Sequence, residues 1–465
     1  MLFDYPQHFI LDISGNNNYH NDKLIRTIMK KPNTPETSHN DSEASPKRGE
    51  LSESSNAPLN SPNSLEPLRV PEPNLDIRAL HGPLGTIVDT IQPDTEAHPA
   101  AILIQAMTGL GNIIGRGPYC QIQENRHYAN LFTIVVGASS VARKGTAWGI
   151  AKTLLNQIAP SWVSSNIKNG LQSGEAIVGH LQDFPISDTS LLLDKRLCLV
   201  EDEFSQVLQA GKRNGSKVSS IMRLGWDHGN LHLLTKKNPL TATGCHISVI
   251  GHITRKELRK LLSSNDTSNG FANRFLWIFS KRTKLLSQAP SLDLNSITKE
   301  LQMLENAVFK ASRMGEVEIK RSARADLLWN DLYKELNDIP EGLWGDTTSR
   351  GPAQVMRLAL LYCLLDGEKT IEPHHLLAAK ALWNYSRDSA RWVFEEYTVS
   401  DPALRILKAL EDGKTLSGAD IHRINHNKLS AEEKNAALEE IKDEIDLEVR
   451  KTRGRDKVTV RRKAA

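Results

Sequence analysis

Apolar residues recur with two different spacings in the middle of the chain. Residues 98–112 and 147–158 carry apolar side chains three and four positions apart, which predicts two amphipathic helices. Between them, residues 131–136 (LFTIVV) form a short apolar, β-branched run that ends at Gly137, as a buried strand would. The order strand, loop, helix is therefore expected across residues 131–158.

Two further apolar runs have the length and composition of buried strands. Residues 196–200 (RLCLV) end at a cluster of acidic residues, and residues 246–250 (HISVI) lead to His252 and Thr254. Helices that alternate with such strands favour a mostly parallel sheet covered by helices. We therefore expect an α/β core whose strands bring their polar end residues to one edge.

The composition divides the chain into five segments. Residues 31–74 are crowded with Pro, Ser, Asn and charge, so we expect a disordered linker there, after a short N-terminal segment at 1–30. The α/β core is expected over 75–290, and the mainly helical pattern of 291–400 predicts a helical lid. Three short helical patterns followed by alternating residues predict a winged helix over 401–465.

Composition and charge exclude some classes of protein. At 465 residues, with 39% apolar and 24% charged residues, the chain can form more than one core. Apolar runs stay below the roughly 18–20 residues of a membrane helix, and no signal-peptide pattern opens the chain, so we expect a cytoplasmic protein without a membrane partner. The four cysteines are isolated from one another, which predicts reduced core residues rather than disulfides or a zinc ribbon.

The loop after residues 131–136 has the residue types of a phosphate-binding loop. Small residues let backbone N–H groups at a helix N-terminus approach a phosphate, Lys144 can reach the terminal phosphates of ATP, and the Thr146 hydroxyl can ligate Mg²⁺. The candidate nucleotide-binding residues are Gly137, Ser139, Ser140, Arg143, Lys144, Gly145 and Thr146.

This loop departs from the usual pattern GxxxxGK[ST] in three ways. It has one extra residue, Arg143 stands where the last glycine belongs, and Gly145 separates Lys144 from Thr146. An ordinary turn between a strand and a helix is the alternative interpretation.

Acidic residues stand where a nucleotide-hydrolysing sheet needs them. Glu201 and Glu203 follow a predicted strand, which would place one carboxylate on Mg²⁺ and another beside the attacking water. Glu175 competes for the water-orienting role, although an acid at a helix N-terminus also has a simple dipole explanation. Arg274 lies among apolar residues and needs an anionic partner, either in a structural salt bridge or at the nucleotide of a neighbouring subunit.

Several segments together resemble a known family. They are GASSVARKGT, GLQSGE, LVEDEF, WDHGNL, ISVIGHIT, NGFANRFLW and RGPAQVMRLALLYCLLD, in this order within residues 78–395. The series resembles a bacterial and phage domain family of unknown function whose members look like divergent P-loop ATPases of the replicative-helicase and primase-associated type. The resemblance implies a RecA-like or AAA-like core, and primase or other replication proteins as partners.

The resemblance also implies roles for individual residues. Lys144 and Thr146 would serve phosphate and metal, and Glu201 and Glu203 would serve metal and water. Thr254 would sense the nucleotide, and Arg274 would act like an arginine finger. Arg357 resembles an arginine that such ATPases send from a lid to the nucleotide, with a solvent-exposed arginine on a core helix as the alternative.

The C-terminal end is strongly basic, although the whole chain carries a formal charge of only +3. Residues 447–463 hold eight basic and two acidic residues, a net charge of +6. Alternating apolar residues on both sides predict a hairpin that presents this charge to DNA phosphates, and a solvated tail is the alternative. The candidate DNA-binding residues are Arg450, Lys451, Arg453, Arg455 and Lys457.

Three functional hypotheses follow from these patterns. The first is an ATP-driven, homo-oligomeric motor on single- or double-stranded DNA, acting in the replication or maintenance of a mobile element. The second is a regulatory DNA-binding protein that senses a nucleotide without hydrolysing it. The third is a primase accessory subunit whose function is assembly.

Overall fold

The computed structural model describes most of the chain after residue 65. The described residues are 66–68, 70–183, 194–234, 238–395, 397–399, 401–410, 414–426, 428–442, 444–450 and 457–463. The segment predicted at 1–30 and most of the linker predicted at 31–74 lie outside these ranges.

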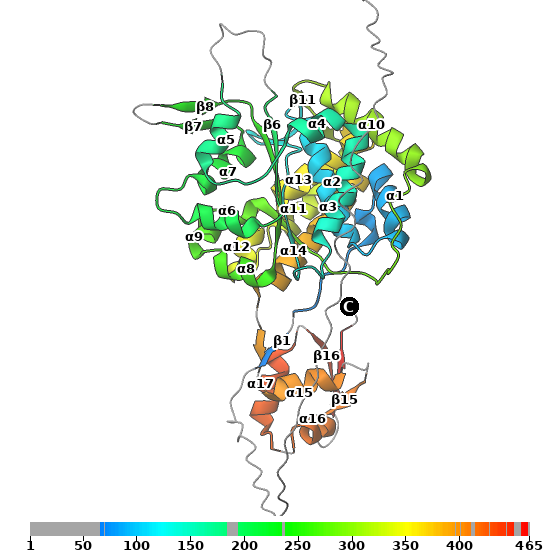
Figure 1. Cartoon of the computed structure of the whole chain (residues 1–465). Coiled ribbons are helices and arrows are strands. Elements are labelled where there is room, and N and C mark those ends of the chain that lie inside the picture. Colours follow the sequence, from blue (N-terminus) through cyan, green and yellow to red (C-terminus); the bar gives the residue numbers. More distant parts are fainter. Residues whose placement is uncertain are drawn as a thin grey trace, which may run out of the picture. The chain divides into compact units, whose positions relative to one another are not determined.

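A five-stranded parallel sheet forms the centre of the fold (Figure 1). Its order is β10 (Phe275–Phe279), β4 (Phe132–Val136), β9 (His246–Ile253), β6 (Arg196–Glu201) and β5 (Ile167–Lys168), and every neighbouring pair is parallel. The three strands β10, β4 and β9 are buried along their whole length, as expected of a parallel sheet covered on both faces, and β9 carries the buried polar residues His246, Ser248 and His252. The expected mixed α/β class with a parallel sheet is confirmed.

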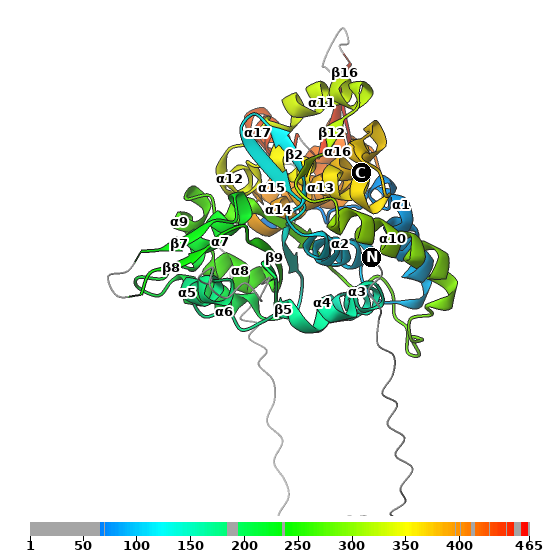
Figure 2. The ribbon, with the colours of Figure 1, turned by 90° about the horizontal axis from the view of Figure 1, so that it is seen from above.

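Helices cover both faces of the sheet. Helices α2 (Pro99–Ile114) and α3 (Lys144–Ile158) lie on one side in Figure 1, and α5 (Gly174–His180), α6 (Phe204–Gly211) and α7 (Val218–Asp227) lie on the other. Viewed from above, α2 and α3 lie side by side (Figure 2). The three fully buried strands β10, β4 and β9 thus run through an interior covered by helices, whereas the edge strand β5 is partly exposed.

Buried polar residues fasten α2 to the sheet. Every residue from Ala100 to Ile114 is buried, so the polar side chains on this helix need partners inside the protein. The Asn112 side-chain amide donates to the Leu197 and His246 carbonyls and to the Ser248 hydroxyl, each at 3.1 Å. These bonds fix the helix against the starts of β6 and β9, because an unpaired amide there would cost about 1–3 kcal/mol.

Four helices that follow residue 290, α10 (Thr298–Ser312), α11 (Ala323–Leu336), α13 (Gly351–Leu365) and α14 (Pro373–Phe394), pack into the same hydrophobic core as α1 (Gly82–Ile91), α2 and α3. Helix α13 is buried at almost every position, so it is surrounded by other elements and does not lie on a surface. Helix α14 packs against α13 and β10. Residues 291–395, which lie within the segment predicted as a helical lid, therefore contribute to the same core as the sheet. We call residues 70–395 the sheet domain. The remaining helices of this domain are α4 (Pro160–Ser165), α8 (Arg255–Leu261), α9 (Ser264–Ser268) and α12 (Gly342–Thr348).

Short strands make small separate sheets. They are β1 (Glu66–Leu68) with β14 (Tyr397–Val399), β7 (Leu231–Leu233) with β8 (Leu240–Ala242), β12 (Lys320–Arg321) with β13 (Thr370–Ile371), and β11 (Val317–Glu318) with β2 (Pro118–Ile122) and β3 (Asn125–Tyr128).

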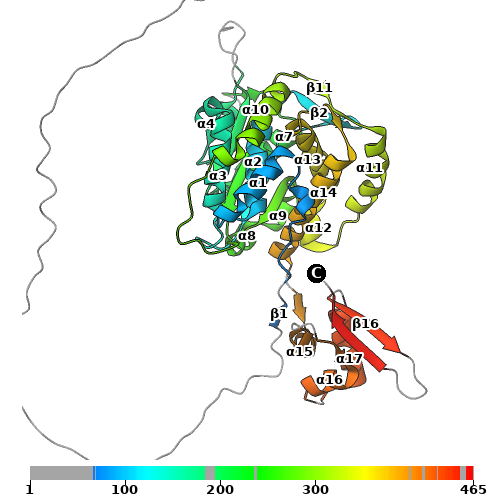
Figure 3. The same cartoon turned by 90° about the vertical axis from the view of Figure 1, so that its right-hand side faces the viewer.

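The C-terminal residues form their own small core around three helices and a hairpin (Figure 3). The elements are α15 (Asp401–Leu410), β15 (Leu416–Ser417), α16 (Gly418–Ile424), α17 (Ala431–Glu440), β16 (Ile445–Arg450) and β17 (Lys457–Arg462). Strand β17 pairs antiparallel with both β16 and β15. The predicted hairpin is confirmed.

The sequence also predicted reduced cysteines in the core and apolar runs too short to cross a membrane. All four cysteines are free and buried, as expected. Within the described ranges, every helix is too short or too polar to cross a membrane.

A buried arginine joins α13 to α7 and to the residues just before β4. Arg357 is 1% exposed, and its guanidinium donates to the Asn130 carbonyl at 2.9 Å and to the Trp226 carbonyl at 2.7 Å. It also stacks on the Trp226 ring, 3.7 Å from the centroid. Burial lowers the pKa of Arg357 to about 9. The expected alternatives, a nucleotide-facing or solvent-exposed arginine, do not describe this buried side chain.

Replacing Arg357 with Ala should lower the free energy of unfolding by about 3 kcal/mol or more, because two buried carbonyls lose their donor and a cavity forms. Urea denaturation measures this change. Arg324→Ala, on the exposed side of α11, is the matched control and should change stability by less than about 0.5 kcal/mol. Equal effects in the two variants would contradict a structural role for Arg357.

Candidate functional site

The carboxyl ends of β4, β6 and β9 open into one cavity of about 830 Å³. Parallel strands end on the same side, so the loop after β4 meets the residues that follow the other two strands. The cavity is lined by three groups: Ser139, Ser140, Arg143, Lys144, Gly145, Thr146 and Trp148; Asp202 and Glu203; and His252, Ile253, Thr254 and Glu257. Six of the seven predicted nucleotide-binding residues thus line one cavity.

Gly137, the seventh, sets the path of the loop. Its N–H donates to the Ile253 carbonyl at 3.2 Å, which fastens the start of the loop to β9. A Cβ at this position would lie 2.2 Å from the Ser280 carbonyl oxygen and 2.5 Å from the Ala142 Cβ. Only glycine fits, because the end of β10 and the returning loop both press against this residue.

Two residues of the loop adopt the left-handed backbone conformation without being glycine. Ser140 has φ 60° and Arg143 has φ 54°. Such a conformation costs a residue with a side chain about 1–2 kcal/mol, so other contacts must stabilise it. Arg143 stands where the usual pattern has its last glycine, and its backbone conformation is one that glycine adopts without cost.

An ion pair holds the Arg143 side chain. Its guanidinium lies 2.5 Å from the Glu96 carboxylate, which is nearly buried and also accepts the Leu286 backbone N–H at 2.8 Å. Glu96 therefore joins the loop to the segment that follows β10. This contact explains how an arginine can occupy the strained position.

Lys144 begins α3 and folds back over the loop. Its ammonium group donates to the Gly137 carbonyl at 2.8 Å and to the Ala138 carbonyl at 3.3 Å. Partial burial lowers the pKa of Lys144. Two neutral carbonyls compensate a partly buried cation weakly, so an anion entering the cavity would offer this amine a better partner.

A second cavity of about 370 Å³ shares Arg143 and Thr146 with the first. Its apolar lining comes from Ile91, Ile150, Leu286, Pro290 and Leu292. Most of its other lining residues are polar, and Asp94, Glu96 and Asp293 are acidic, so the cavity offers a ligand both apolar contact and hydrogen-bond partners.

The residues after β6 provide the acidic side of the first cavity. Asp202 lies 3.1 Å from His252, whose other ring nitrogen lies 2.8 Å from the Gln105 side chain. The hydrogen bond from His252 lowers the pKa of Asp202, so this carboxylate stays ionised. The Glu203 carboxylate accepts a hydrogen bond from the Gln206 side-chain amide at 2.6 Å, and Glu203 lines the same cavity.

Glu201, predicted as a metal ligand, points elsewhere. Its carboxylate accepts the backbone N–H groups of Gly170 at 3.1 Å and Leu171 at 2.8 Å, and only 7% of the residue is exposed. It does not line the cavity. Glu201 holds the loop after β5, so Asp202 is the acid that the structure places with Glu203.

Of three other predicted residues, Thr254 and Arg274 make structural contacts and Glu175 is exposed. Thr254 caps α8, since its hydroxyl accepts the Glu257 N–H at 3.2 Å and donates to the Glu257 carboxylate at 2.7 Å. Glu175 is exposed in the first turn of α5 and does not line the cavity. Arg274 is 6% exposed and forms a two-point ion pair with Asp227, at 3.2 and 2.7 Å, so its anionic partner lies within the chain.

The candidate DNA-binding residues are only partly described. Lys451, Arg453 and Arg455 lie outside the described residues. Arg450 and Lys457 are register partners at the ends of β16 and β17 that meet the undescribed connection.

Sequence reasoning missed, among others, the acidic residues Asp202, Glu96 and Glu257 of this site. Asp202 stands between the two predicted acids, so its direction depended on where β6 ends. Glu96 and Glu257 carried no signal, because their roles arise from contacts with the loop and with the cap of α8.

Comparison with known proteins adds no assignment: no protein-family model matches the chain, and no curated protein matches its sequence.

Replacing Gly137 with Ala should destabilise the protein by about 1–3 kcal/mol, since the added methyl group displaces the loop or the end of β10. Chemical denaturation measures the effect. Gly145→Ala is the matched control, because a Cβ there meets no atom within 4 Å and alanine favours the helix. A Gly137→Ala protein as stable as the Gly145→Ala protein would contradict the tight approach.

Proposed function

We propose that the sheet domain binds a nucleoside triphosphate with Mg²⁺ and hydrolyses it, and that this ATPase acts as a motor on DNA. The observation that carries the proposal is the meeting of Lys144 and Thr146 with Asp202, Glu203 and His252 around one cavity. A triphosphate needs a cation, backbone donors and a metal in this arrangement, and its hydrolysis needs a carboxylate near the attacking water.

The phosphates would lie at the start of α3. There the helix N-terminus attracts anions, Lys144 exchanges its two carbonyl partners for phosphate oxygens, and the exposed Thr146 hydroxyl is available to Mg²⁺. Asp202 would hold the metal directly or through water, and Glu203 would orient the attacking water. In this proposal Asp202 takes the metal role first expected of Glu201.

The base would lie in the second cavity. Because the two cavities share Arg143 and Thr146, a nucleotide can place its phosphates in one and its base in the other. The apolar lining from α1, α3 and the segment after β10 suits a flat aromatic ring.

The C-terminal elements support the DNA part of the proposal. Their order, with β15 completing a three-stranded sheet, is consistent with a winged helix. The connection between β16 and β17 carries Lys451, Arg453 and Arg455, which would contact DNA phosphates in any sequence.

A nucleotide sensor that does not hydrolyse ATP is the second candidate. The observation that favours it is the engagement of Glu201 by two backbone N–H groups, which removes one of the predicted acids from the cavity. If Asp202 and Glu203 do not take over the role predicted for Glu201, the site would bind a nucleotide and alter the contacts of the loop without hydrolysing the nucleotide.

Lys144→Ala should reduce ATP affinity at least about tenfold and abolish turnover, because a charged hydrogen bond to phosphate is lost. The free energy of unfolding without nucleotide should stay nearly unchanged. In the same assays Glu203→Gln should bind ATP normally and hydrolyse it at least about a hundredfold more slowly. Calorimetry and phosphate release give the two readings.

Glu175→Gln is the matched control and should behave as the unaltered protein. Unchanged ATP affinity in Lys144→Ala would refute the assignment of the loop. A slow Glu175→Gln protein beside a normal Glu203→Gln protein would move the water-orienting role to α5.

Replacing Lys451, Arg453 and Arg455 together with Gln should weaken DNA binding and lower its dependence on salt. Each lost phosphate contact on duplex DNA reduces the log–log slope by about 0.9, so we expect a decrease of about 2–3. Fluorescence anisotropy at several salt concentrations measures both quantities, and ATP turnover without DNA should persist.

A triple Gln variant of Lys299, Lys310 and Lys320 is the control, since these exposed residues give the same change in net charge on the sheet domain. If the log–log slope of DNA affinity against salt concentration falls equally in both triple variants, the hairpin has no specific part in DNA binding.

A further inference from the structure

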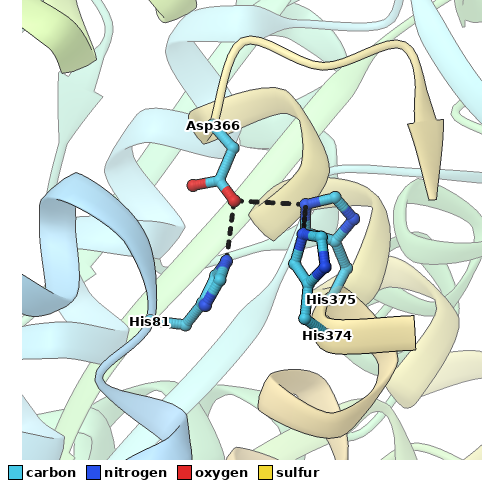
Figure 4. A group of neighbouring side chains, drawn as sticks. All are labelled: His81, Asp366, His374 and His375. Atoms are coloured by element: carbon cyan, nitrogen blue, oxygen red, sulfur yellow. Dashed lines mark hydrogen bonds and ion pairs between the residues drawn. The ribbon is translucent and has the colours of Figure 1, made fainter. Parts of the chain in front are cut away.

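Four side chains with metal-binding atoms meet where three helices begin or end (Figure 4). His81 precedes α1, Asp366 follows α13, and His374 and His375 lie in the first turn of α14. One ligand atom from each lies within 4.8 Å of every other. None of the four lines the proposed nucleotide cavity, so this cluster is independent of the proposed function.

His375 is the buried member of the cluster. It is fully buried, and its Nδ1 accepts the Glu372 backbone N–H at 2.9 Å. A neutral imidazole that accepts at Nδ1 carries its proton on Nε2, so His375 donates from Nε2 to the Asp366 carboxylate, 3.1 Å away. This ring is therefore a hydrogen-bond donor that orients Asp366, and its Nε2 lone pair is not free for a metal.

The other two histidines converge on the same carboxylate and on the same space. The His81 Nε2 lies 2.7 Å from the Asp366 Oδ2. His374 is exposed and could extend into solvent, yet its ring turns back over the cluster, with its Nε2 3.1 Å from that of His375. Two imidazole nitrogens and a carboxylate oxygen thus face one another, with an open side toward solvent at His374.

We propose that His81, Asp366 and His374 bind one divalent transition-metal ion of the zinc class, with His375 holding the carboxylate in place. Two imidazoles and one carboxylate suit zinc, and an oriented ligand of this kind is a usual companion of such sites. With bonds of about 2.0–2.2 Å, tetrahedral ligand atoms lie about 3.3–3.6 Å apart, so ligand atoms that lie within 4.8 Å of one another need only a small movement of the side chains. Water would complete the coordination on the exposed side.

The ion would act as a structural clamp. It would join the segment before α1 to the turn between α13 and α14, residues that are 285 positions apart along the chain. Because the unfolded chain does not hold these ligands together, binding favours the folded state.

The test uses the full chain without an affinity tag, freed of metal by a chelator. Zinc should bind with one equivalent per chain and raise the unfolding temperature. Cobalt(II) at one equivalent should give the intense visible absorption of a low-coordinate site with nitrogen and oxygen ligands, and zinc should displace it.

Two variants assign the ligands. His374→Ala changes an exposed side chain, and His81→Asn keeps a residue favoured at a helix N-cap, so both should fold. Each should weaken zinc binding at least about tenfold, in line with the loss of one ligand. His232→Ala, which removes an exposed histidine from β7, should leave binding unchanged.

The proposal is overturned if zinc leaves the unfolding temperature unchanged and cobalt gives only the weak spectrum of the hydrated ion. The cluster is then a hydrogen-bonded network around Asp366. Stoichiometric binding that survives both His374→Ala and His81→Asn would equally refute this ligand set.

Discussion

Five parallel strands end at the same edge of one sheet, and the candidate site depends on that alignment. The loop after β4, the acids after β6 and the His252 of β9 come from distant parts of the sequence. Register pairs such as Val136 with Ile253 bring their ends level. The alignment is stable because helices cover both faces and because the buried Asn112 side chain ties α2 to β6 and β9, while Arg357 ties α13 to α7 and to the residues before β4.

The sequence predicted those parts of the fold whose signal is local. The runs at β4, β6 and β9 are short, largely apolar and bounded by polar residues, so the positions of these strands could be inferred, although β9 continues to Ile253, three residues beyond the predicted run. Strand β10 was not predicted, because a continuous apolar run of five residues, FLWIF, fits a buried helix segment as well as a strand. Strand β5 has two residues, too few for any periodicity.

The site was harder to predict than the fold because it depends on direction and on distant partners. Successive residues of a strand point to opposite sides, so an error of one position exchanges Glu201 for Asp202. The partner of Arg274 is Asp227, 47 positions away, and no sequence pattern joins the two. The same holds for His81 and Asp366, which only the packing of α1 against the end of α13 brings together.

The backbone conformation of the loop at Arg143 depends on an ion pair with Glu96. A glycine at this position would keep its backbone conformation at any ionic strength. Arg143 adopts the same conformation beside the Glu96 carboxylate, which also accepts the Leu286 backbone N–H. The loop and the segment after β10 are therefore held by the same carboxylate. An anion that competes for the guanidinium would weaken the contact between Arg143 and Glu96, and salt would screen the attraction in the same way.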